Sequence, residues 1–204
     1  VTAAIAPPSP APRRLTADEV AVPGPTARAA AGDWLLESRD GRVRFVVGGI
    51  GHPEGFQESG GNLLDVTVDG GPDHLDGLST WFAEEFPRQA RYSDARVEGD
   101  ALVVTGLDGG DPTLTVTTRW RVEAGADGVL AALRVATTVH NGGSAPVAHA
   151  LGDIVGWGSL RHFGPGLGHA LQGTRGALPW LGAESADYGV VLLGDGPLTG
   201  PHGA

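Results

Sequence analysis

One glycine-rich stretch of the sequence concentrates residue types that could bind a ligand. Asp153, Trp157, Arg161, His162 and His169 fall within 17 positions, and the glycines between them let a ligand approach the backbone. An aromatic face beside an acid and two imidazoles suits a sugar, because apolar sugar faces stack on rings while hydroxyls need fixed polar partners. The sequence favours a structural interpretation instead, in which Trp157 packs in the core and Asp153 bonds a loop backbone.

Other patterns that carry chemistry are weak. The sequence has no cysteine, no GxSxG nucleophile elbow and no HxH or HExxH metal motif. The DHLD run at 73–76 is interpreted as a solvated turn, and His149 shares a strand face with Asp153 only if that strand is continuous. The glycine run GGIGHP at 48–53 lacks the Walker lysine and precedes no amphipathic helix, so we interpret it as a strand connection. We therefore predict no catalytic residue, no metal and no cofactor.

The charge balance limits the partners of this chain. Its net charge is -10 and its pI is near 5.0, and the only adjacent cations are Arg13 and Arg14. Phosphate binding needs clustered cations, so we expect no nucleic-acid partner. Nothing approaches the roughly 18 consecutive apolar residues of a membrane span, which we therefore do not expect. The first residues also lack the charged and apolar regions of a signal peptide.

From residue 32 onward the hydrophobic residues recur with a period of two, which predicts strands. The clearest case is 113–122, where Leu114, Val116, Trp120 and Val122 fall on one face. Residues 129–139 alternate again after a glycine-containing turn, so the two segments predict a long antiparallel hairpin. We expect further strands at 43–47, 64–68, 101–105, 147–155 and 188–193.

Two segments depart from this pattern. Residues 78–86 have apolar side chains four apart and a proline after them, which predicts a short helix. Residues 1–31 hold six prolines among alanines and few large apolar groups, so we expect an extended linker or tail. Many strands, glycine-rich turns and almost no helix predict one all-β antiparallel sandwich or barrel domain over residues 32–204.

Five segments of this domain together resemble a domain of large secreted bacterial proteins. They are GDWLLE at 32–37, RVRFVV at 42–47, GGNLLD at 60–65, TVHNGGSAP at 138–146 and LGDIVGWG at 151–158. The domain is a galactose-mutarotase-like β-sandwich, or supersandwich. In myxobacterial and related proteins it precedes regulatory-like modules and a PHP-type (carbaryl-hydrolase-like) metallohydrolase domain. The resemblance covers about residues 32–204 and implies a sandwich that is incomplete at its C-terminal end.

The resemblance implies a non-catalytic N-terminal module of a larger protein that is secreted or lies in the periplasm or cell envelope. Its partners would be other domains of the same polypeptide, one of them possessing metal-dependent hydrolase chemistry. Sugar epimerases of this fold use two histidines and a late carboxylate, but only His162 and His169 lie in the corresponding region. The alternative is an autonomous carbohydrate-binding or sugar-epimerase-like protein that uses residues 153–169.

Overall fold

The structure is a computed structural model, and every regular element in its described part is a β-strand. It describes residues 9–55, 57–73, 75–82, 88–125, 129–148, 151–158, 160–165, 174–175, 177–198 and 201–202. The chain divides into two compact units, Val1–Gly156 and Trp157–Ala204, where the sequence predicts one sandwich domain. The described residues contain no helix that is long and apolar enough to cross a membrane.

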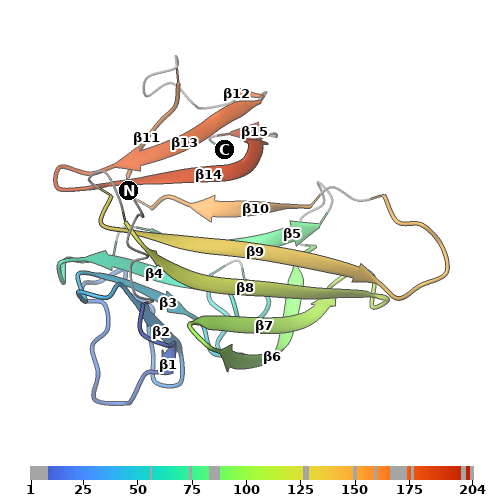
Figure 1. Cartoon of the computed structure of the whole chain (residues 1–204), viewed down its shortest axis with the longest axis horizontal. Coiled ribbons are helices and arrows are strands. Elements are labelled where there is room, and N and C mark those ends of the chain that lie inside the picture. Colours follow the sequence, from blue (N-terminus) through green and yellow to red (C-terminus); the bar gives the residue numbers. More distant parts are fainter. Residues whose placement is uncertain are drawn as a thin grey trace, which may run out of the picture. The chain divides into compact units, whose positions relative to one another are not determined.

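The first unit contains two antiparallel sheets (Figure 1). The six-stranded sheet has the order β1-β2-β3-β4-β5-β10, and the four-stranded sheet has the order β6-β7-β8-β9. The strands of the first sheet are β1 (Arg13–Arg14), β2 (Trp34–Glu37), β3 (Val43–Val47), β4 (Leu63–Val68), β5 (Gly77–Phe82) and β10 (Leu151–Gly156). Those of the second are β6 (Ala90–Glu98), β7 (Ala101–Asp108), β8 (Leu114–Ala124) and β9 (Ala131–Asn141).

The second unit is also built from antiparallel strands. Its three-stranded sheet has the order β11-β13-β14, and two short strands, β12 and β15, pair separately. The strands are β11 (Arg161–Phe163), β12 (Thr174–Arg175), β13 (Leu178–Glu184), β14 (Gly189–Leu198) and β15 (Pro201–His202). Together the two units make an all-β protein of several antiparallel sheets, which confirms the predicted fold class at this level.

The predicted hairpin is confirmed as β8 and β9, which pair from Leu114 opposite Asn141 to Ala124 opposite Ala131. The alternation along β8 buries Leu114, Val116, Trp120 and Val122, as the sequence pattern predicts. Trp120 is only 1% exposed. The inner face of this sheet is therefore the apolar core of the first unit.

The predicted helix at 78–86 is wrong for its first five residues, which belong to strand β5. All six residues of β5 are buried, and the strand lies between β4 and β10. Residues four apart share a face in a strand as well as in a helix, so the spacing of Leu78 and Phe82 fits both structures. Residues 83–86 of the predicted helix lie outside the described residues.

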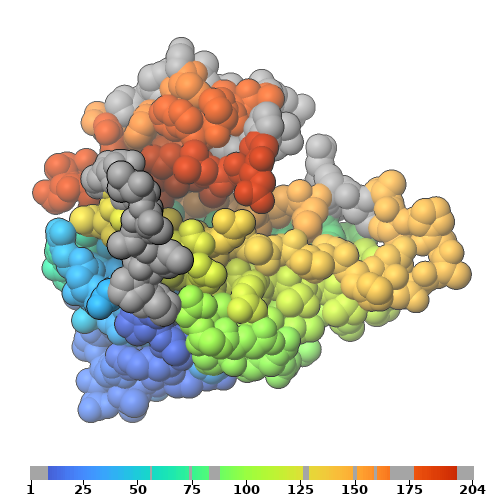
Figure 2. Space-filling view, viewed as in Figure 1, coloured from blue at the N-terminus to red at the C-terminus, as the bar shows by residue number. Residues whose placement is uncertain are grey.

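The structure of residues 9–31 also differs from the extended linker that the sequence predicts. This segment contributes strand β1, and it buries Leu15, Ala21 and Val22 against Leu35 and Val46 of the six-stranded sheet. Figure 2 shows these N-terminal residues in blue, packed against the rest of the first unit. The segment thus covers one face of the sheet, a role that its proline-rich composition concealed.

The GGNLLD run owes its glycines to close packing. A side chain at Gly60 would collide with the carbonyl of Gly49, and one at Gly61 would collide with the ring of Tyr92. Gly61 also has a φ of 86°, which side-chain-bearing residues rarely adopt. Its amide donates to the carbonyl of Gly48 at 2.8 Å. The run therefore fixes the loop that begins at residue 48 against the start of β4.

Candidate functional site

Three of the five residues singled out in the sequence are described residues of the second unit. The rings of Trp157 and His162 are 6.0 Å apart between centroids and tilted by 44°. The Arg161 guanidinium makes an exposed ion pair with Glu184 at 3.0 Å. His169 lies outside the described residues, as do the secondary candidates His74 and His149.

Asp153 lies in the first unit, within a row of hydroxyl groups between the two sheets. Its Oδ1 accepts a hydrogen bond from Thr80 of β5 at 2.9 Å. Thr80 Oγ1 lies 3.5 Å from Thr137 Oγ1 of β9, which in turn bonds Thr118 Oγ1 at 2.9 Å. The row ends at the buried hydroxyl of Tyr92, 2.6 Å from Thr118. Burial raises the pKa of Tyr92, so this phenol stays neutral and serves as a hydrogen-bonding group.

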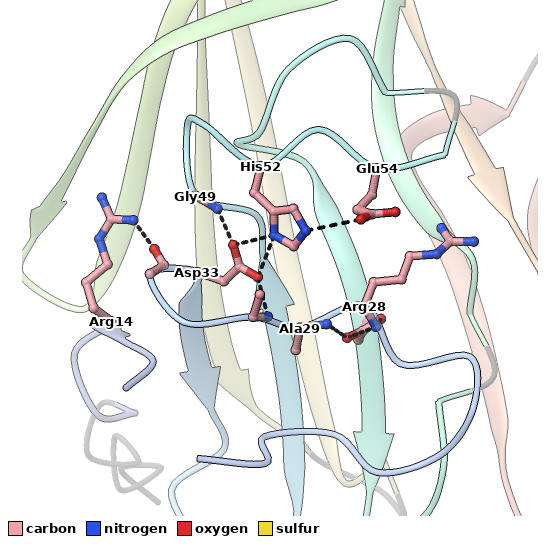
Figure 3. Close-up of polar contacts among 10 residues, drawn as sticks. Arg14, Arg28, Ala29, Asp33, Gly49, His52 and Glu54 are labelled. Carbon is pink, nitrogen blue, oxygen red and sulfur yellow. Dashed lines mark hydrogen bonds and ion pairs between the residues drawn. The ribbon is translucent and has the colours of Figure 1, made fainter. Parts of the chain in front are cut away.

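A second polar cluster, which the sequence analysis missed, is centred on His52 (Figure 3). His52 Nδ1 lies 2.9 Å from both carboxylate oxygens of Asp33, and Nε2 lies 3.2 Å from Glu54 Oε1. Asp33 is 1% exposed and also accepts backbone amides from Gly49 at 2.7 Å and Ala30 at 2.7 Å. The glycine run at 48–53 is thus a strand connection that also presents an imidazole between two acids.

The two carboxylates favour the charged form of His52. Burial alone would lower the pKa of this imidazole, but hydrogen bonds and charge from Asp33, with a smaller contribution from Glu54, outweigh it and raise the pKa. The protonated ring can donate to both acids at once. His52 therefore links the buried Asp33 to the more exposed Glu54.

Glu54 also lines a surface pocket of about 240 Å³ in the first unit. The pocket lies on the side of β5 and β10 opposite to Thr80 and Asp153, because residues alternate between the faces of a strand. Its principal side chains are Arg28, Glu54, Gln57, Asp76, Trp81 and Ile154.

Hydrogen bonds hold the walls of this pocket in place. Arg28 donates to the backbone carbonyl of Asp76 at 2.9 Å and pairs with its carboxylate at 3.4 Å. Gln57 Nε2 donates to the carbonyl of Leu63 at 3.0 Å, whereas the buried Gln57 Oε1 has no hydrogen-bond partner among the described residues. Trp81 donates its indole N–H to Ser79 at 3.0 Å.

Two further buried carboxylates tie the N-terminal segment and the 73–76 loop to strand β4. Asp65, which is 0% exposed, accepts the amides of Arg28 and Ala29, the latter at 2.7 Å. Asp73 is 4% exposed and accepts the amide of Val66 at 2.9 Å, so the interpretation of 73–76 as a solvated turn is wrong at Asp73. Burial raises the pKa of both carboxyls, that of Asp73 to about 6.

No group of three or more histidines and acids that could hold a metal ion occurs in the part of the chain that the structure describes. The acids near His52 are bound to backbone amides or to the imidazole itself. The sequence offered one signal for the His52 cluster, which is the acid two residues after this histidine. The contact with Asp33, 19 positions away, could not be read from spacing.

Comparisons of this chain with family models, with curated proteins and with solved structures found no match. The fold and the site therefore define only a class, which is an all-β protein of several antiparallel sheets with a pocket beside its six-stranded sheet.

Proposed function

We propose that this chain is a non-catalytic β-sandwich module of a larger secreted or cell-envelope protein, with a galactose-mutarotase-like arrangement. The observation that supports this most is the state of His52, whose two ring nitrogens both contact carboxylates. A general base needs a free nitrogen within reach of the proton that it removes.

By the resemblance, hydrolytic chemistry would belong to a separate metal-binding domain of the same polypeptide. The test is to sequence the gene beyond the codon for Ala204. The proposal expects further β-modules and metal-ligand motifs in the same reading frame. A stop codon directly after Ala204 and a native protein of this size would contradict it.

A second candidate function is carbohydrate binding or epimerisation through residues 153–169. The proximity of Trp157 to His162, at 6.0 Å, favours it, because a ring beside an imidazole can stack on a sugar and bond its hydroxyls.

The variant Trp157→Ala tests this second candidate, with Trp180→Ala as a control from the same unit. If Trp157 lines a cleft, the variant keeps its stability but loses any sugar-dependent change in tryptophan fluorescence, which the control retains. A loss of about 3 kcal/mol or more in the free energy of unfolding, with no sugar response in the parent protein, would place Trp157 in a core and remove this candidate.

A further inference from the structure

We propose that strand β9 is a docking edge, at which two copies of this chain pair their sheets to form a symmetric dimer. This inference goes beyond the module role and does not rest on it. β9 lies at the edge of the four-stranded sheet (Figure 1), and among the described residues it pairs only with β8. An edge strand leaves a row of backbone N–H and C=O groups free, and a strand of another molecule can pair with them.

Of the four edge strands that the structure describes in the first unit, β9 is the least protected against such pairing. β1 has only two residues, and β10 has six, of which two are glycines. β6 has an irregular register between Tyr92 and Asp94 and exposes charged side chains along its length. β9 has eleven residues, no proline, no acid and an unbroken register against β8. Short strands, bulges and charges are the usual protection of an edge, so β9 is the open one.

The inner face of β9 has apolar side chains that a further strand would cover. Leu133, Val135 and Val139 point to the core but are only half-buried. The residues opposite them on β8 are at most 3% exposed. A strand added beside β9 would therefore bury apolar surface as well as pair backbone groups.

The backbone of β9 determines which groups face its free edge. The amide of Gly142, directly after the strand, donates to the carbonyl of Thr113 at 3.0 Å, so the backbone of Gly142 faces the neighbouring strand. Successive residues of a strand alternate in the direction of their N–H and C=O groups. The free edge therefore presents both groups of six residues, which are Ala131, Leu133, Val135, Thr137, Val139 and Asn141.

A second copy of β9 fits this edge in antiparallel orientation, with Ala136 on the two-fold axis. This register is the one that overlaps all eleven residues of both strands. Val135 then exchanges two backbone hydrogen bonds with the partner's Thr137. Leu133 does the same with the partner's Val139, so the apolar inner rows of the two strands become neighbours.

The charges of β9 favour a second copy as the occupant of this edge. In the same register Arg134 lies opposite the partner's Thr138, so no like charges stand directly opposite each other, where they would destabilise the pair. The chain has a net charge of -10, and two such molecules repel each other over most of their surface. A long edge strand without an acid lets them approach.

The test is sedimentation equilibrium of the full 204-residue protein and its variants. A single pair of strands is a small interface, so we expect a dimer with a Kd of about 10–100 μM. Ala136 is exposed, and Ala136→Arg and Ala136→Glu each place like charges opposite one another on the axis. Each variant should therefore weaken dimerisation about tenfold or more. An equimolar mixture of the two should dimerise again, because opposite charges then meet.

Val97→Arg is the matched control. Val97 is 39% exposed on β6, the edge strand on the other side of the same sheet. This variant adds the same charge to an edge that the proposal leaves unpaired, so its dimer should be as stable as that of the parent protein.

Each outcome decides the proposal. A dimer that both Ala136 variants weaken, that their mixture restores and that Val97→Arg leaves intact supports it. A mass that stays at 20.8 kDa at about 500 μM, fivefold above the weakest expected Kd, overturns it. So does a dimer that Ala136→Arg leaves intact or that Val97→Arg disrupts, and so does a mixture that stays monomeric. Assemblies that grow beyond two copies also overturn it, because two-fold pairing at one edge is closed.

Discussion

At the scale of single residues, the sequence revealed the residue types of the candidate sites but not their partners. The run at 48–53 was correctly interpreted as a strand connection, yet the pairing of His52 with Asp33 depends on how two loops fold together. Asp153 was singled out as a site residue and is part of a hydroxyl row between sheets. Such long-range contacts leave no periodic trace in one sequence.

Asp73 provides a prediction at this scale. Burial, with a contribution from the charge of Asp65, raises its pKa from 3.8 to about 6, so the folded state binds this proton more tightly than the unfolded state. The ionised carboxylate therefore destabilises the fold increasingly as pH rises from about 4 to 6. Asp73→Asn keeps an oxygen that can accept the amide of Val66 but cannot ionise.

We expect Asp73→Asn to match the parent protein in stability near pH 4 and to exceed it at pH 7.5 by up to about 3 kcal/mol. Urea denaturation at both pH values measures the difference. Asp69→Asn serves as the control, because Asp69 is exposed and pairs with Arg42 at the surface. A variant that is less stable than the parent protein at pH 7.5 would show that the Asp73 charge is needed.

At the scale of elements, the sequence predicts the β8–β9 hairpin and strands β3, β4 and β7, but it does not predict strand β5 or the packing of the N-terminal segment. The β8–β9 hairpin follows from a two-residue period over eleven residues in each strand. Strand β5 was mistaken for a helix because residues four apart share a face in both structures. The N-terminal segment was mistaken for a linker because composition does not show that Leu15 and Val22 meet a sheet face.

The N-terminal segment can be tested with one pair of variants. Leu15 is 5% exposed within a cluster that includes Leu35 and Val46, so Leu15→Ala should lower the free energy of unfolding by about 2–4 kcal/mol. Val20 is in the same segment but 74% exposed, and Val20→Ala should change it by less than about 0.5 kcal/mol. Equal, small effects in thermal or urea unfolding would restore the view of this segment as a loose tail.

At the scale of the whole molecule, the sequence predicted the all-β antiparallel class, and the structure confirms it in the described part of both units. It did not predict the division at residues 156 and 157, because LGDIVGWG reads as one continuous run. The finer assignment to a mutarotase-like fold stays a prediction. Proteins of that fold include enzymes, so the proposed non-catalytic role needs a test of its own.

The rate of anomer interconversion tests whether this chain is catalytic. Freshly dissolved α-D-glucose and α-D-galactose are followed by NMR with and without the 204-residue protein at pH 7. We expect the protein to leave the rate at its buffer value, even where the same spectra show sugar binding. A rate that rises in proportion to protein concentration, and falls back when His52 is replaced by Asn, would contradict it and make the chain an enzyme.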